Sequence, residues 1–160
     1  MKSVFIAIEG FNLKQGYIIK ELSIVYPDDS HQHYQFKTPE NFTPSVADKI
    51  TIKYSKNYLN GFSIEDNFYL PNDLHLTILN EFANFKIYVA GEITQRFIST
   101  ILPETNIVDV CSLMDFQYPT ELPDPHCFQI HHARYCSLAK ARYIQQSLKD
   151  FFFKEEHIMN

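Results

Sequence analysis

Two cysteines and two adjacent histidines lie close together in the segment CFQIHHARYC, residues 127–136. Cys127, His131 and Cys136 have the spacing C-x3-H-x4-C. Thiolate and imidazole groups bind zinc in tetrahedral geometry, at metal–ligand distances of roughly 2.0–2.3 Å. The spacing therefore favours a metal site, and a closed structural zinc site needs a fourth ligand. The candidates for this ligand are Glu9, Cys111, His126 and His132.

The same cluster has two other interpretations. One is a catalytic cysteine with a nearby histidine as its general base, although proximity in sequence does not establish the geometry that this chemistry requires. The other is a loop that holds small apolar cysteines and solvent-exposed histidines. The sequence has no glycine-rich phosphate-binding loop and no serine nucleophile-elbow motif. The cluster is therefore its main chemical signal.

The composition is typical of a folded globular protein. The 160 residues are 45% hydrophobic and 21% charged, and 15% are aromatic. This length favours one domain, expected over residues 1–154 and followed by a tail at 155–160. The net charge of −5 disfavours strong nonspecific binding to nucleic acid. The sequence does not indicate an oligomeric state.

The sequence also indicates a compartment. Its N-terminal apolar run is short and is interrupted by Glu9, unlike a secretory signal. No apolar run approaches the roughly 20 residues of a membrane span. The cysteines number three, which is not the even count of a disulfide framework. We therefore expect a protein without a membrane partner, located in the cytoplasm or nucleus and not secreted, with reduced thiols.

The elements that must position the cluster follow from hydrophobic periodicity. β-Rich runs at 4–8, 17–26 and 33–37 predict three strands, able to form an antiparallel meander. Further strands are expected at 86–91 and 106–110. Helices are expected at 45–60, 73–85 (with Asp73 as N-cap), 92–102 and 136–153. This order predicts one α/β domain in which helices flank a mixed sheet.

The layout and three short segments resemble the DEDD-type exonucleases, which have an RNase H-like fold. IAIEGFNLKQGYIIKELSIVY resembles the first strands of that family, with Glu9 at the Glu of its D-x-E motif and Ala7 at the Asp. IYVAGEITQRFISTIL resembles the later strand and helix, but it has no Asp around Gln95. His131 and Cys136 match the final H-x4-D motif, with Cys in place of Asp. The resemblance implies an RNase H-like mixed sheet, with an antiparallel meander plus parallel strands, flanked by helices.

The positions at which this sequence departs from the family pattern are the ones that hold the catalytic metal ions in that family. Two-metal phosphodiester hydrolysis needs carboxylate oxygens to hold magnesium or manganese. Of the four acidic positions only Glu9 is retained, and Cys136 is a soft ligand that favours zinc. The resemblance therefore implies a catalytically degenerate domain rather than an enzyme.

A closer resemblance is to the Maelstrom domain of the piRNA pathway and to related insect and insect-virus proteins. It rests on the Cys/His cluster and on CSLAKA, which opens the last predicted helix. That domain lacks the acidic quartet and carries a Glu-Cys-His-Cys zinc set. The resemblance implies structural zinc held by Glu9, Cys127, His131 and Cys136. It also implies binding to RNA or protein partners, in RNA silencing.

Two alternatives remain open. One is an active metal-dependent 3′–5′ exonuclease or ribonuclease with a rearranged site. Its ligands would be Glu9, Glu92, Asp109 and either His131 or His132. The other is a pure protein-interaction module, such as a viral antagonist, which the acidic charge and many aromatic residues fit.

Overall fold

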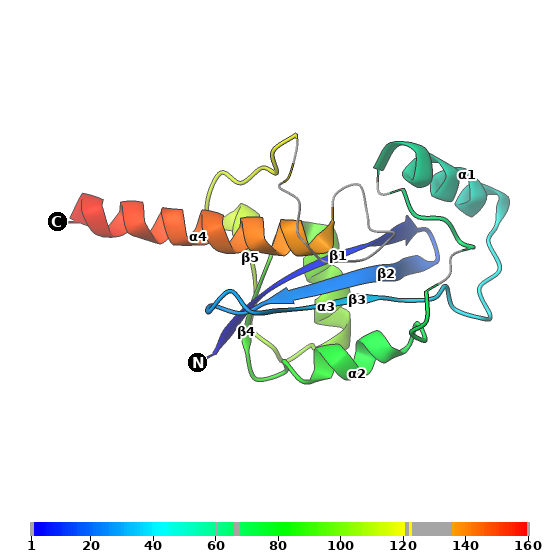
Figure 1. Cartoon of the computed structure of the whole chain (residues 1–160), viewed down its shortest axis with the longest axis horizontal. Coiled ribbons are helices and arrows are strands. Elements are labelled where there is room, and N and C mark those ends of the chain that lie inside the picture. The colour runs from blue at the N-terminus through cyan, green and yellow to red at the C-terminus, as the bar shows by residue number, and fades with distance from the viewer. Residues whose placement is uncertain (1, 60, 66–67, 121, 123–135, 160) are drawn as a thin grey trace.

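The computed structural model describes residues 2–59, 61–65, 68–120, 122 and 136–159. Its centre is a five-stranded sheet in the order β3-β2-β1-β4-β5 (Figure 1). β2 pairs antiparallel with both β1 and β3, whereas β4 pairs parallel with β1 and β5. The strands are β1 (Ser3–Leu13), β2 (Gly16–Val25), β3 (His31–Gln35), β4 (Lys86–Val89) and β5 (Ile107–Asp109).

Helices cover both faces of this sheet. They are α1 (Val46–Tyr54, continued by a π-helical turn Ser55–Leu59), α2 (Leu74–Asn80), α3 (Glu92–Ile101) and α4 (Ser137–Met159). Figure 1 shows α4 lying across one face and α2 and α3 on the other. The α/β fold class with a flanked mixed sheet is confirmed, and the arrangement is consistent with an RNase H-like fold. No helix in the described part of the chain is both long and apolar enough to cross a membrane.

Strand alternation divides the core into two layers. One face of β1 points toward α2 and α3 and carries Val4, Ile6 and Ile8. These side chains pack in one cluster with Ile78, Leu79, Phe82 and Ile98. Phe5 and Ala7 point the other way and pack against α4. The predicted inner face of α4 is confirmed, because its four expected positions are all buried: Leu138, Ala141, Ile144 and Leu148.

Several boundaries differ from the sequence-based predictions. β1 runs to Leu13 rather than ending at Ile8, because the hairpin with β2 continues past a bulge. α2 ends at Asn80, and Asp73 at its N-cap position makes no side-chain capping hydrogen bond. α4 continues to Met159, so the backbone at 155–159 is helical where a tail was expected.

The bulge itself depends on Gly10. The register steps from Glu9 opposite Glu21 to Gly10 opposite Ile19, so Lys20 is the extra residue. A Cβ on Gly10 would lie 2.0 Å from the backbone oxygen of Ile18. Only glycine therefore fits where the two strands approach here.

We expect Gly10→Ala to lower the free energy of unfolding by about 1–3 kcal/mol, because the methyl group forces the strands apart. Asn12→Ala, at an exposed position of the same strand, is the control and should change stability by less than about 0.5 kcal/mol. Urea denaturation measures both. Equal stability of the two variants would contradict the close approach.

Candidate metal centre

Buried polar side chains gather on the sheet face that lies beneath the start of α4. The strand register places Glu9 opposite Glu21, Glu21 opposite Gln35, and Ser23 opposite His33. Directly opposed residues have Cβ atoms about 4.5–5.5 Å apart and project to the same face. Glu9, Glu21, Ser23 and Gln35 are all buried. Three strands thus contribute one continuous polar layer inside the domain.

Three members of this region have the chemistry of a metal site. One ligand atom each from Glu21, His33 and Cys136 lies within 4.8 Å of the other two. Tetrahedral zinc sites set their ligand atoms roughly 3.3–3.8 Å apart, so these donors are close to the separation that zinc needs. A carboxylate oxygen, an imidazole nitrogen and a thiolate sulfur are all established zinc ligands. The residues present therefore fit zinc.

The start of α4 holds the Glu21 carboxylate. Oε1 accepts hydrogen bonds from the backbone N–H of Ser137 at 2.7 Å and from its hydroxyl at 2.6 Å. The carboxylate thereby satisfies one backbone donor at a helix N-terminus, where negative charge is favoured. Oε2 accepts from Nε2 of Gln35 at 3.2 Å and lies 3.8 Å from Nε2 of His33. Glu21 therefore links the helix to the two strands beside it.

Hydrogen bonds also orient the imidazole. Nδ1 of His33 lies 2.6 Å from the hydroxyl of Ser23, which in turn lies 2.7 Å from the hydroxyl of Ser137. Since Nδ1 is bound to Ser23, Nε2 is the nitrogen that would hold a metal. Histidine ligands in metal sites are commonly fixed in this way through the other ring nitrogen.

The burial of Cys136 and His33 argues against Cys136 as a catalytic nucleophile. Cys136 is 3% exposed and the side chain of His33 is 4% exposed. A catalytic cysteine needs access for a substrate and an environment that favours thiolate. This arrangement suits a buried structural metal better than a cysteine–histidine catalytic pair.

Of the predicted ligands that lie in the described residues, Cys136 alone belongs to the cluster. The predicted positions His126, Cys127, His131 and His132 lie outside the described residues. Glu21 and His33 were not predicted as ligands. The available signal was charge in an otherwise apolar strand: Glu21 and its neighbour Lys20 interrupt YIIKELSIV. The sequence pattern does not show that β2 pairs with β3, and this pairing brings His33 close to Glu21.

Glu9, the predicted carboxylate ligand, is engaged elsewhere. Its carboxylate contacts the ammonium group of Lys140, one turn into α4. The same Nζ lies 5.3 Å from the ring centroid of Tyr118. Burial, followed by the charge of Glu9, raises the pKa of Tyr118 well above its usual value, so this phenol stays neutral. Within the described residues, the metal-capable group contains Glu21 and not Glu9.

The other candidates have structural contacts. Glu92 is exposed and forms an i,i+4 ion pair with Arg96. Oδ1 of Asp109 accepts from the backbone N–H of Gly91 at 2.8 Å and of Cys111 at 3.0 Å. Partial burial, and then the charge of Asp109, raises the pKa of the Cys111 thiol. A raised pKa disfavours the thiolate form that metal binding requires.

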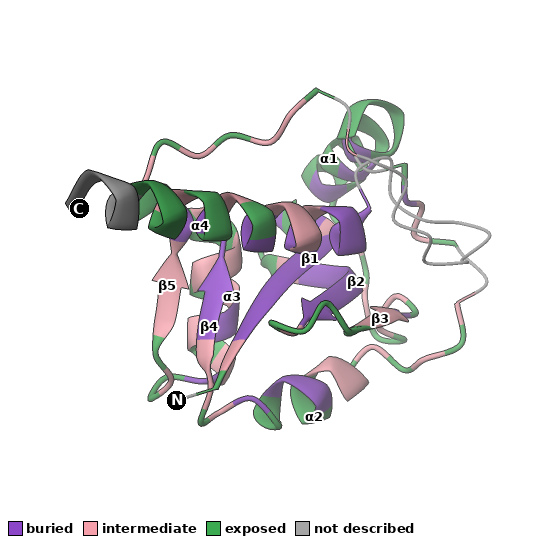
Figure 2. Ribbon diagram, turned by 60° about the vertical axis from the view of Figure 1, so that its left-hand side comes forward, coloured by how far each residue is buried: buried purple, intermediate pink, exposed green. Residues whose placement is uncertain are grey.

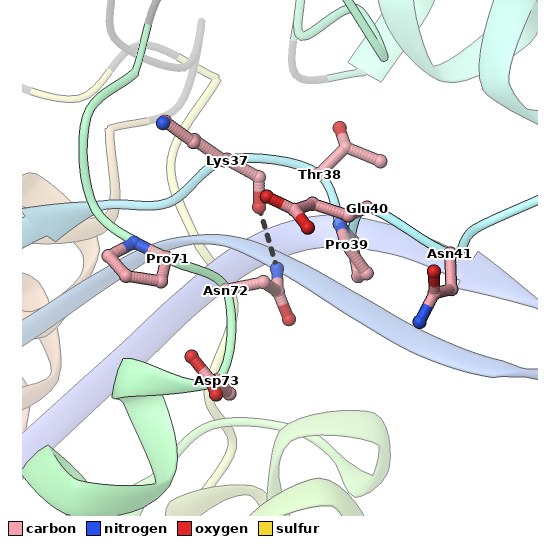
Figure 3. Close-up of a pocket in the computed structure, with 8 residues that line it drawn as sticks. All are labelled: Lys37, Thr38, Pro39, Glu40, Asn41, Pro71, Asn72 and Asp73. Atoms are coloured by element: carbon pink, nitrogen blue, oxygen red, sulfur yellow. Dashed lines mark hydrogen bonds between the residues drawn. The ribbon is translucent and has the colours of Figure 1, made fainter.

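A surface pocket of about 500 Å³ shares no lining residue with this polar layer (Figure 3). It lies between the segment after β3 and the start of α2, and Nδ2 of Asn72 donates there to the carbonyl oxygen of Lys37 at 2.9 Å. Its lining residues are Lys37, Thr38, Pro39, Glu40, Asn41, Pro71, Asn72 and Asp73. One lysine and two acidic residues in an open surface pocket do not define a ligand chemistry.

Comparison with known proteins gives no further identification, since neither any protein-family model nor any curated protein matches this chain.

Ser137→Ala tests the polar layer independently of any metal. The variant removes the hydroxyl that bonds both Glu21 and Ser23, and should lower the free energy of unfolding by about 1–3 kcal/mol. Ser147→Ala, a half-buried position on the same helix, is the matched control and should be nearly neutral. Chemical denaturation of both variants measures the difference. Equal effects would mean that the hydroxyl does not stabilise the interface.

Proposed function

We propose that this chain is a non-hydrolytic RNA-binding domain of RNase H-like architecture, stabilised by a structural zinc ion. The observation that carries the proposal is the buried cluster of Glu21, His33 and Cys136. These ligands belong to β2, to β3 and to the residue before α4, so a metal ion here would join the helix to the sheet. The sequence predicts both Cys127 and His131 as ligands, and either one would complete a set of four with these three residues.

The contacts of the acidic side chains support a binding role over hydrolysis. Two-metal hydrolysis requires several carboxylates that converge on one accessible position. Here the Glu9 carboxylate contacts Lys140, and Asp109 accepts from two backbone amides. Glu92 is exposed and pairs with Arg96. The positive charge of Lys140 beside Glu9 disfavours a divalent cation there by electrostatic repulsion.

The choice of RNA as ligand rests on resemblance. The sequence resembles DEDD-type exonucleases and, more closely, the Maelstrom domain, and both families are connected with RNA. An RNA-silencing setting is what the second resemblance implies. A protein partner remains the alternative prediction.

The zinc content of the purified protein tests the proposed structural zinc ion. We expect one zinc ion per chain by mass spectrometry or atomic absorption of the purified protein. Cys136→Ser and His33→Asn should each abolish stoichiometric zinc and lower the free energy of unfolding by roughly 4 kcal/mol or more, because metal binding contributes directly to folding. A chelator should lower the melting temperature of the wild type.

The chain offers matched controls for these variants. Cys111 is exposed and His31 lies on the same strand as His33 but outside the cluster, so Cys111→Ser and His31→Asn should retain zinc. Glu21→Gln should weaken zinc binding more than Glu9→Gln, which separates the two carboxylates. Wild-type protein without zinc, or zinc retained in both cluster variants, would contradict the proposed centre.

A nuclease assay tests the proposal that the domain does not hydrolyse nucleic acid. We expect no cleavage of single-stranded RNA or DNA above background with magnesium or manganese, because the carboxylates needed to hold these ions have other contacts. Glu9→Gln is the informative comparison. Metal-dependent cleavage that disappears in this variant would establish the enzyme alternative instead.

A further inference from the structure

α1 is attached to the domain through a narrow inner face. Of its residues and those of the π-helical turn, only Asp48, Ile52 and Ser55 are buried. Asp48 forms a capping box with Ser45, and its carboxylate contacts Gln15 in the β1–β2 turn. Ile52 packs in a small core cluster with Phe11, Leu13, Ile18 and Phe62. This attachment fixes which side of α1 faces solvent, and Figure 2 shows the helix as mostly exposed.

An apolar row runs along the outer side of this helix. Val46, Ile50, Tyr54 and Tyr58 follow one another at intervals of four residues, and they are 77%, 67%, 55% and 63% exposed. The ring centroids of Tyr54 and Tyr58 lie 5.0 Å apart. Contiguous exposed apolar side chains of this kind usually mark an interaction surface.

A row of lysines lies beside the apolar row. Lys49, Lys53 and Lys56 are exposed and are spaced by four and three residues, which places them on one side of the helix. None of the ion pairs found among the described residues includes these lysines. In a chain with a net charge of −5, this helix presents a local positive strip.

We infer that the outer side of α1 and its π-helical turn binds single-stranded nucleic acid. The two tyrosines stack against bases, and the three lysines contact phosphates. Aromatic side chains beside a cationic track are the combination that recognises single strands, because every base has a face that can stack. The inference rests on the proposed RNA-binding function and assigns it a surface.

The shape of the surface favours this occupant over two others. A partner helix binds in a groove, whereas α1 presents a convex ridge along which an extended strand can lie. A helix that lies in a membrane surface carries its polar face opposite the apolar face. Here the side opposite the apolar row packs against the domain, and the lysines occupy one flank.

Fluorescence anisotropy with a labelled oligouridylate of about 12 nucleotides, within the usual range of site sizes, tests the inference on the full chain. We expect Tyr54→Ala and Tyr58→Ala each to weaken binding roughly 5- to 140-fold. Tyr54→Phe and Tyr58→Phe should bind nearly as well as wild type. Tyr69→Ala, at an exposed tyrosine outside α1, is the matched control and should have no effect.

Salt dependence tests the lysines. Three phosphate contacts give a slope of log K against log salt of about −2, since each contributes about −0.7 on a single strand. Replacing Lys49, Lys53 and Lys56 together by Gln should bring the slope close to zero. Lys154→Gln, at an exposed position near the C-terminal end of α4, should leave the slope unchanged.

The outcomes separate this inference from the proposed function. Oligonucleotide binding that survives both the tyrosine and the lysine variants would overturn the α1 surface but leave RNA binding in place. Equal affinity for a duplex of the same length would overturn base stacking. Absence of oligonucleotide binding would overturn the inference and the RNA-binding function together, whether or not the protein binds vesicles of phosphatidylcholine and phosphatidylserine. The zinc measurement stands by itself.

Discussion

The domain depends on the contact between the Glu21 carboxylate and the first residue of α4. That contact joins positions 116 residues apart in the chain and is buried. It satisfies one backbone N–H at the start of the helix, and it places a carboxylate beside His33 and Cys136. The register of β1, β2 and β3 follows from the same requirement, because a shift by one residue would turn Glu21 to the opposite face of the sheet.

Most of the fold follows from hydrophobic periodicity. The apolar run at Val4–Ile8 and the four buried positions of α4 are patterns within single elements, so the sequence alone predicts them. The polar cluster is different, because its members become neighbours only through strand pairing. Nothing local in the sequence distinguishes Glu21 from Glu9, which lies directly opposite it. Their roles differ because Ser137 binds one and Lys140 contacts the other.

The polar layer and the support for α1 occupy different parts of the sheet. One part of the α4-covered face carries the polar layer, which is enclosed and suited to holding the domain together. Farther along the β1–β2 hairpin, a smaller apolar cluster supports α1 and leaves its outer side open. The proposed zinc centre and the proposed binding surface thus lie in separate regions, so exposed residues of α1 can change without altering the buried cluster.

The bulge at Lys20 is what separates these regions. On the Val25 side of Lys20, Glu21 and Ser23 face α4; on the Gly16 side, Ile18, which lies opposite Phe11, faces that side of the sheet. The extra residue thus reverses the phase of β2 halfway along its length. A one-residue deletion at Lys20 would keep the present partners of Ile18, Ile19 and Glu21 in β1, whereas a deletion between Glu21 and Val25 would turn part of β2 to the opposite face of the sheet. During evolution, insertions and deletions in this hairpin should therefore be confined to the turn and to the bulge.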